Sequence, residues 1–198
     1  AIGLPWEGRP QTEVRMAELE QLPESELWPS GSTSDDTALT LLVAEHLANA
    51  GGLGEPIDFL RRLSERSGSI QGLGPSTTRA IQHFTATGGV DESGSDTNGA
   101  PMRALPVGWA VPAFTDAKRR EWTIALTRLT HTGREAITAA CVMSACATWA
   151  IEGAHPSMLS EIADLEAAVV GPDTNVARAV SAVHHNCWAP PVEGITLA

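Results

Sequence analysis

REAITAACVMSACATWAIEG, at residues 134–153, is the stretch that decides the fold class. Its six alanines and its larger apolar side chains, among them Ile137, Val142 and Met143, are spread around every side of a helix built from it. A helix that is apolar on all sides is covered by neighbouring elements. The stretch therefore predicts a central helix with other helices packed closely around it.

The rest of the chain carries the helical period as well. From Leu39, apolar residues recur at the i+3, i+4, i+8 and i+11 spacings until Gly51-Gly52, where glycine favours a helix end. The same reading predicts further helices at about residues 58–66, 75–88, 116–129, 157–169 and 176–188. Strand signals are nearly absent. We therefore expect an all-α fold, as a single compact multi-helix domain over residues 1–198.

The composition excludes several classes of protein. The chain has 198 residues, of which 42% are hydrophobic, and 13 Lys and Arg against 24 Asp and Glu give a net charge of −11. It is too apolar to be disordered, and it has no run of about 20 apolar residues to cross a bilayer. Its acidity makes nucleic acid an unfavourable partner. We expect no membrane and no nucleic-acid partner.

The cysteines indicate the compartment. Cys141, Cys146 and Cys187 are odd in number and show no CxxC spacing, which fits neither a disulfide framework nor a zinc site. We interpret all three as small buried apolar side chains in a reducing, cytoplasmic environment. The chain starts at Ala1 without a methionine or a secretory signal, which indicates a fragment.

The residues just before the first strong helix form the sharpest chemical feature. Gly31-Ser32-Thr33-Ser34-Asp35-Asp36-Thr37 combines hydroxyl groups with two adjacent carboxylates. One interpretation is a helix start, because serine and aspartate cap free N–H groups and acids favour the positive end of the helix dipole. The other is a site for a hard cation such as Mg²⁺, which takes oxygen ligands and relieves repulsion between neighbouring carboxylates. These residues alone leave both interpretations open.

Further along, two segments could contact a ligand. Asn98-Gly99-Ala100-Pro101-Met102-Arg103 ends a polar loop and predicts either a tight turn or a close approach of backbone N–H groups to phosphate oxygens. Leu129-Thr130-His131-Thr132-Gly133 joins two predicted helices, and its histidine fits either a packed imidazole or a functional group. The basic cluster Lys118-Arg119-Arg120 is predicted to be a solvent-exposed face.

In order along the chain, five segments together resemble the ADP-ribosylglycohydrolase family. Ile2 to Gly8 is similar to the end of the family's Gly-Asp-Ala-Leu-Gly-x-x-x-Glu motif, and Gly31 to Thr37 to its Gly-x-x-Thr-Asp-Asp-Thr motif. Gly72 to Thr78 resembles its Gly-Pro-(Ser/Thr)-Thr segment, and Asn98 to Pro106 its Asn-Gly-x-x-Met-Arg-x-x-Pro motif. Leu129 to Thr132 resembles its Leu-Thr-His-(Thr/Ser) junction, so the resemblance spans residues 2–151.

The resemblance implies a two-magnesium centre in a cleft that holds ADP-ribose, and a hydrolase that cleaves the glycosidic bond between ADP-ribose and an acceptor. It implies an ADP-ribosylated protein or an ADP-ribose-containing small molecule as partner. Motif by motif, the expected metal ligands are Ser34, which replaces the usual threonine, Asp35 and Asp36; the expected catalytic residues are Glu7 and Asp36; and the expected substrate-binding residues are Ser95, Asp96, Asn98, Gly99 and His131.

Two departures from the family pattern shape the expectation. The Gly-Gly-Asp-x-Asp-Thr motif, which supplies further metal ligands in many members, does not occur, and Gly194 to Ala198 resembles the run before it. We therefore expect a domain that is incomplete at both termini. Such a domain would contain half of the metal site, which residues beyond Ala198 would complete, and the fragment itself would be inactive. Near Gly72 no aspartate stands where some relatives have a proposed base. The alternative is a non-catalytic ADP-ribose-binding or structural member of the family.

Overall fold

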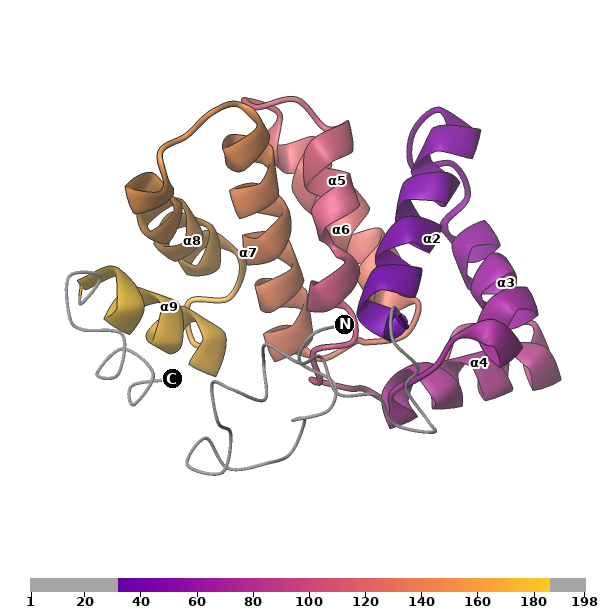
Figure 1. Cartoon of the computed structure of the whole chain (residues 1–198). Helices are drawn as coiled ribbons and strands as arrows, with labels where there is room; N and C mark the ends of the chain where they lie inside the picture. The colour runs from indigo at the N-terminus through magenta and orange to yellow at the C-terminus, as the bar shows by residue number, and fades with distance from the viewer. Residues whose placement is uncertain (1–31, 186–198) are drawn as a thin grey trace, which may run out of the picture.

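The computed structural model describes residues 32–185, which fold into α-helices and 3-10 turns without a strand (Figure 1). The prediction of an all-α fold is confirmed. The described elements are α2 (Asp35–Ala50), α3 (Pro56–Arg66), η3 (Ser67–Ser69), α4 (Pro75–Thr87), η4 (Pro101–Arg103), α5 (Leu105–Ala110), α6 (Asp116–Arg128), α7 (Arg134–Ile151), α8 (Pro156–Val170) and α9 (Asn175–His185).

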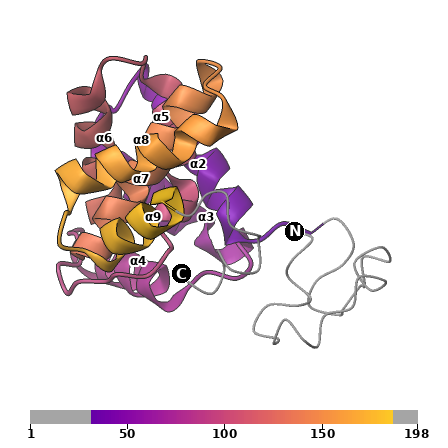
Figure 2. The same ribbon diagram turned by 90° about the vertical axis from the view of Figure 1, so that its left-hand side faces the viewer.

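Helix α7 is the centre of this arrangement, as its composition predicts. It contacts α5 and α6 on one side and α8 and α9 on the other, while α2, α3 and α4 lie beyond α5 (Figure 1). Figure 2 shows α8 and α9 crossing the outer face of α7. Small residues such as Ala136, Ala140 and Ala145 are fully buried along α7. Two of its larger apolar side chains depart from the all-buried pattern, because Met143 is 38% exposed and Ile151 is 64% exposed.

The apolar side chains gather in two clusters on either side of α7. The larger one joins α2, α3, α4, α5 and α6 through Leu39, Leu42, Val43, Leu47, Phe59, Leu60, Leu63, Ile81, Val107, Val111, Leu126 and Leu129. The smaller one joins α7, α8 and α9 through Val142, Ala163, Ala167 and Ala177. The larger cluster holds α2, α4 and the α6–α7 junction in fixed positions, and these elements carry the predicted site motifs.

The contact between α5 and α7 depends on a glycine. An ideal Cβ on Gly108 would lie 2.2 Å from the Ser144 carbonyl oxygen and 2.8 Å from the Ala147 Cβ. The Thr148 hydroxyl also donates to the Gly108 carbonyl at 2.8 Å. The two helix backbones therefore touch directly at this point.

Gly108→Ala is expected to lower the free energy of unfolding by about 1–3 kcal/mol, because the added methyl group forces the two helices apart. Urea denaturation measures the change. Gly68→Ala is the matched control, since a Cβ there meets no atom within 4 Å. An unchanged midpoint for Gly108→Ala would contradict the direct contact.

The structure also shows how three helices begin. Pro106 lies in the first turn of α5, where proline loses no hydrogen bond. Thr115 occupies the N-cap position of α6. Helix α2 begins at Asp35, four residues before the apolar stripe starts at Leu39.

The prediction of an exposed basic face at Lys118-Arg119-Arg120 is confirmed for Lys118, which is exposed, but it is wrong for Arg119, which is buried, and Arg120 is half-buried. Arg119 is only 1% exposed, and it donates to Glu166 of α8 at 2.8 Å. Arg120 binds the same carboxylate through two hydrogen bonds of 2.8 and 2.7 Å. The two arginines thus join α6 to α8 from within the fold. Separately, no helix in the described part of the chain combines the length and apolar character that a membrane span requires.

Candidate functional site

The predicted acidic pair lies at the first turn of α2. Ser34 occupies the N-cap position, but its hydroxyl makes no capping bond to the helix backbone. It is buried, and it donates instead to the Asp36 carboxylate at 2.7 Å. Helix capping alone therefore does not account for this hydroxyl, although both acids still lie at the positive end of the α2 dipole.

Asp35 is half-buried, and its surroundings disfavour its charge. Burial raises the pKa of Asp35, and the neighbouring Asp36 carboxylate raises it further, while backbone N–H groups, that of Gly74 among them, act in the opposite direction. Within residues 32–185, neither acid forms a salt bridge. Two neighbouring carboxylates without a described cationic partner are the electrostatic setting in which a divalent cation is stabilising.

The Gly74 contact brings α4 next to the acidic pair, and α4 in turn holds the polar loop. Ser76, in the first turn of α4, accepts hydrogen bonds from the hydroxyls of Ser95 at 2.6 Å and Thr97 at 3.2 Å. An ideal Cβ on Gly99 would lie 3.2 Å from the Thr77 hydroxyl oxygen. Three of the segments quoted above thus meet at the start of α4.

The fourth segment to reach the site is the α6–α7 junction, through His131. The His131 side chain is 0% exposed, and its Nε2 lies 2.9 Å from the Thr97 hydroxyl oxygen. A Cβ on Gly99 would lie 2.8 Å from its ring, so only glycine fits at this point of the loop. Nδ1 of the ring lies 2.7 Å from the Thr130 hydroxyl oxygen. His131 is therefore a packed imidazole that supports the loop.

The surroundings of His131 keep the ring neutral. Burial lowers its pKa to about 4, and the nearby positive charges of Arg103 and Arg79 contribute. The folded-state pKa is thus below the unfolded-state value, so the unfolded chain takes up this proton first as the pH falls. The stability that His131 contributes is complete above about pH 6.5 and is lost as the pH approaches 4.

This predicts a pH dependence of folding that a variant can remove. The free energy of unfolding of the wild-type protein is expected to fall from pH 6.5 toward pH 4, and His131→Gln is expected to flatten this part of the curve. Urea titrations across the range measure it. The exposed His83 gives the control, since His83→Gln should keep the wild-type slope. Equal slopes for both variants would contradict the assignment.

The loop itself is fixed at both ends. Arg79 of α4 donates to the Asp91 carboxylate and to the Gly94 carbonyl, both at 2.8 Å. The Asp96 carboxylate accepts the backbone N–H groups of Glu135 and Ala136, at 3.0 and 3.3 Å, and so caps the start of α7. The loop therefore links the starts of α4 and α7.

The sequence of the chain also matches a known family. A family model described as ADP-ribosylglycohydrolase matches residues 1–195. The chain belongs to the ADP-ribosylglycohydrolase family. A solved structure named as an ADP-ribosylglycohydrolase-related protein complex is similar to the chain with a TM-score of 0.60 and 26% sequence identity. The match covers 86% of this chain and 65% of that one, so the chain spans about two thirds of its length. No curated protein sequence matches the chain.

Against this family background, the structure places the predicted site residues as follows. Ser34, Asp35 and Asp36 lie together at the start of α2, and Ser95 and Gly99 lie against α4. Asn98 is exposed at the loop's turn. His131 lies beneath the loop and Asp96 faces α7, so their expected contacts with ADP-ribose stay predictions. Glu7 falls outside the described residues.

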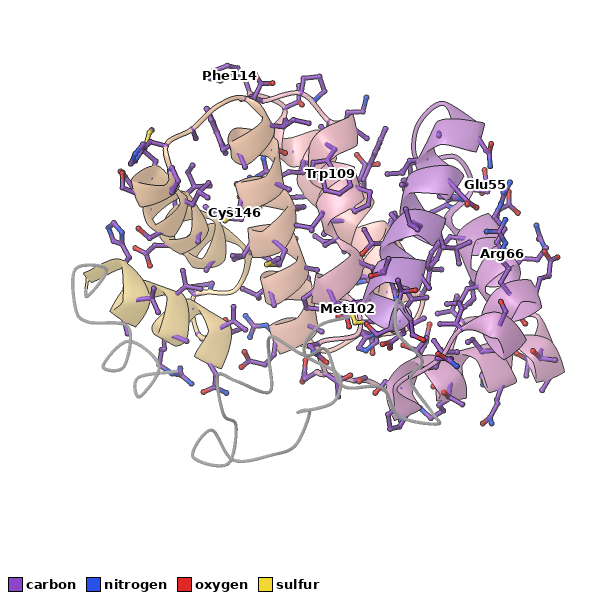
Figure 3. All side chains as sticks on the ribbon, viewed as in Figure 1. Glu55, Arg66, Met102, Trp109, Phe114 and Cys146 are labelled. Atoms are coloured by element: carbon purple, nitrogen blue, oxygen red, sulfur yellow. The ribbon has the colours of Figure 1, made fainter. Side chains whose placement is uncertain are left out.

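Several residues that organise the site received no role in the sequence analysis. Ser76 and Thr97 link α4 to the loop, and Arg103 binds both the loop and the α6–α7 junction. Thr40 of α2 donates to the Met102 carbonyl at 3.1 Å, which places η4 beside α2. Figure 3 shows Met102 near the lower end of α2. Membership of the quoted motifs was the available sequence signal for Ser76 and Arg103, whereas Thr97 carried none beyond its place in the polar loop.

Proposed function

We propose that this member of the ADP-ribosylglycohydrolase family is a Mg²⁺-dependent hydrolase that cleaves the glycosidic bond between ADP-ribose and an acceptor on a protein side chain or a small molecule. The observation that carries the proposal is that the start of α4 contacts both Asp35, through Gly74, and the loop at Ser95–Gly99. An acidic, metal-compatible group thus lies next to a glycine-containing loop and helix N-termini that suit phosphate.

The donor set supports magnesium. Ser34, Asp35 and Asp36 offer one hydroxyl and two carboxylates, which are the oxygen donors that Mg²⁺ prefers. The raised pKa of Asp35 reflects burial and like-charge repulsion, both of which a cation at this point would offset. Residues 32–185 hold no group of three His, Cys, Asp or Glu side chains suited to a metal ion. The remaining ligands would therefore be water, substrate oxygens or residues outside this range.

The second part of the site suits the nucleotide. The first turn of α4 has no side-chain cap, and its N–H groups, like those of the loop, favour an anionic oxygen. Gly99 allows the loop backbone to approach a ligand closely, while His131 and Thr77 support it from the other side. We assign the diphosphate of ADP-ribose to this loop, with Asn98 at its exposed turn.

The chemistry of the bond explains the role of the acids. Glycosidic cleavage passes through an oxocarbenium-like state that nearby carboxylates stabilise. Bound Mg²⁺ would supply orientation of ribose hydroxyls and activation of water. Asp35 and Asp36 would hold the ion, and Asp36 is the more exposed of the two. Glu7 is proposed as a second carboxylate at the reacting ribose.

The proposal is tested by calorimetric titration of the protein with ADP-ribose, in Mg²⁺ and in EDTA, together with a turnover assay on ADP-ribosylated arginine and serine peptides. Mg²⁺-dependent binding with release of ADP-ribose supports the hydrolase. Binding without turnover by the complete protein would instead establish the alternative, a non-catalytic ADP-ribose-binding member. Absence of binding in both buffers would contradict the proposed function.

A further inference from the structure

Arg103 is a buried cation with an unusual set of partners. It is only 2% exposed, and its guanidinium lies 5.1 Å from the centre of the Phe59 ring. It donates to the Gly99 carbonyl at 3.1 Å and to the Thr130 hydroxyl at 2.7 Å. No carboxylate in residues 32–185 pairs with it. Burying a charge without an ion pair costs free energy. We therefore expect the hydrogen bonds of Arg103 to orient the groups that accept them.

The hydrogen bond from Arg103 to Thr130 begins a chain whose direction depends on where the Thr130 hydroxyl hydrogen goes. Arginine can only donate, so the Thr130 hydroxyl accepts from Arg103 and keeps its own hydrogen for another acceptor. Among the described residues, that acceptor is Nδ1 of His131 at 2.7 Å. A neutral imidazole that accepts at Nδ1 carries its hydrogen on Nε2. Nε2 then donates to the Thr97 hydroxyl oxygen at 2.9 Å.

The chain of hydrogen bonds ends in the first turn of α4. The Thr97 hydroxyl passes its hydrogen to Ser76 Oγ at 3.2 Å, and the Ser95 hydroxyl donates to the same oxygen at 2.6 Å. Both lone pairs of Ser76 Oγ are then used, and its own hydrogen is directed away from Thr97 and Ser95. Among the hydrogen bonds described for residues 32–185, none is donated by the Ser76 hydroxyl. Ser76 lies two residues after Gly74, whose backbone N–H donates to the Asp35 carboxylate.

We propose that Arg103 is a positioning residue that sets the direction of a hydrogen-bond chain through Thr130, His131 and Thr97, so that the chain leaves the Ser76 hydroxyl as a donor to an acceptor oxygen of the ligand. This rests on the proposed function only in naming ADP-ribose as that ligand. The Nε2–H form of His131 and the direction of the chain follow from the Arg103 donor together with the Thr130 hydroxyl hydrogen, which has no described acceptor besides Nδ1 of His131. Arg103 does this through other residues, because it is buried beneath the loop.

The first test reads the direction of the chain without any ligand. Long-range ¹H–¹⁵N correlation spectra of ¹⁵N-histidine-labelled protein, at neutral pH, distinguish a hydrogen on Nδ1 from one on Nε2. His131 is identified by the signal that His131→Gln loses. We expect the Nε2–H form in the wild-type protein. The Nδ1–H form, or a charged ring, would overturn the proposal whether or not ADP-ribose binds.

The second test changes the two ends of the chain, with ADP-ribose affinity measured by calorimetry in Mg²⁺. Arg103→Gln is expected to mix the two His131 tautomers and weaken binding roughly tenfold, while Arg103→Lys, which keeps a charged donor, retains the Nε2–H form. Ser76→Ala is expected to keep the tautomer and to weaken binding by a similar factor, since one hydrogen bond to a charged oxygen is lost.

Arg66→Gln is the matched control, because Arg66 lies on α3, away from Met102 and the site (Figure 3), and pairs only with Glu45 among its described salt bridges. It should bind as the wild type does. A folded Arg103→Gln protein with an unchanged tautomer, or wild-type affinity in Ser76→Ala, would overturn the proposal. If Arg103→Gln fails to fold, the wild-type tautomer and Ser76→Ala decide. If the wild type does not bind ADP-ribose, the proposed function fails while the spectra still decide the direction of the chain.

Discussion

Asp35→Asn is expected to reduce Mg²⁺-dependent release of ADP-ribose by the complete protein by at least roughly 100-fold. Loss of a residue that only supports a metal ligand costs 10- to 100-fold in affinity or activity, and a direct ligand contributes more. Asparagine keeps the shape of the side chain but loses the negative charge that holds the ion. Asp36→Asn is expected to act in the same way. The measurement is the rate of ADP-ribose release at saturating Mg²⁺, followed by a metal titration that tests for partial rescue.

A stability measurement separates a metal ligand from a helix-start residue. The folded-state pKa of Asp35 is raised, so its contribution to stability is lost as the pH rises through that pKa, and the ionised group is unfavourable at neutral pH. In EDTA, Asp35→Asn should therefore unfold at the wild-type temperature or above it. A carboxylate that served only the helix dipole would cost about 0.3–1 kcal/mol when removed. A clear loss of stability with wild-type turnover would contradict the metal assignment.

Asp58→Asn provides the control for both measurements. Asp58 is also an acid in the first turn of a helix, in this case α3, and it forms an exposed salt bridge with Arg61. It lies in none of the site motifs. The variant should keep wild-type turnover and its metal dependence, so that any general effect of removing a first-turn acid is measured separately.

The sequence predicted what depends on neighbours along the chain. The apolar surface of residues 134–153 predicted a central helix, and α7 is that helix. Pro75 and Gly88 predicted both ends of α4, because proline fits the first turn and Gly88 adopts the left-handed conformation at φ 74°. The ordered motifs predicted that Asp35, Gly99 and His131 would belong to one site, and the structure brings them around the start of α4.

What the sequence could not predict depends on contacts between distant residues. Three consecutive basic residues are typical of an exposed face, and the buried carboxylate that pairs with Arg119 belongs to Glu166, 47 positions further along the chain. Asp96 has the chemistry of a ligand-binding acid, and its use as the cap of α7 follows from how the loop returns to that helix. The role of His131 likewise required the positions of Thr97 and Arg103. The residue type determines which interactions a side chain can make, whereas the packing of the fold determines which partner it contacts.

The buried ion pair between α6 and α8 gives the largest expected effect on stability. Glu166 is 4% exposed and is the carboxylate partner of both Arg119 and Arg120. Arg119 also pairs with Asp116, but its Nε, which is buried, already lacks a hydrogen-bond partner. Removal of the Glu166 charge would leave a buried guanidinium without adequate compensation.

Glu166→Gln is therefore expected to lower the free energy of unfolding by about 3–5 kcal/mol, as urea denaturation would measure. The double variant Arg119→Met with Glu166→Leu should recover most of this loss, because an apolar pair of similar volume carries no desolvation cost. Asp173→Asn, which breaks the exposed pair with Arg134, should leave the midpoint nearly unchanged. If the double variant were no more stable than Glu166→Gln, the loss would come from packing between α6 and α8, or from Arg120, which loses the same carboxylate, rather than from the uncompensated charge of Arg119. Recovery in the double variant would show that the ion pair contributes little net stability. It would also show that the loss in Glu166→Gln comes from removing one charge of the pair while the other stays buried.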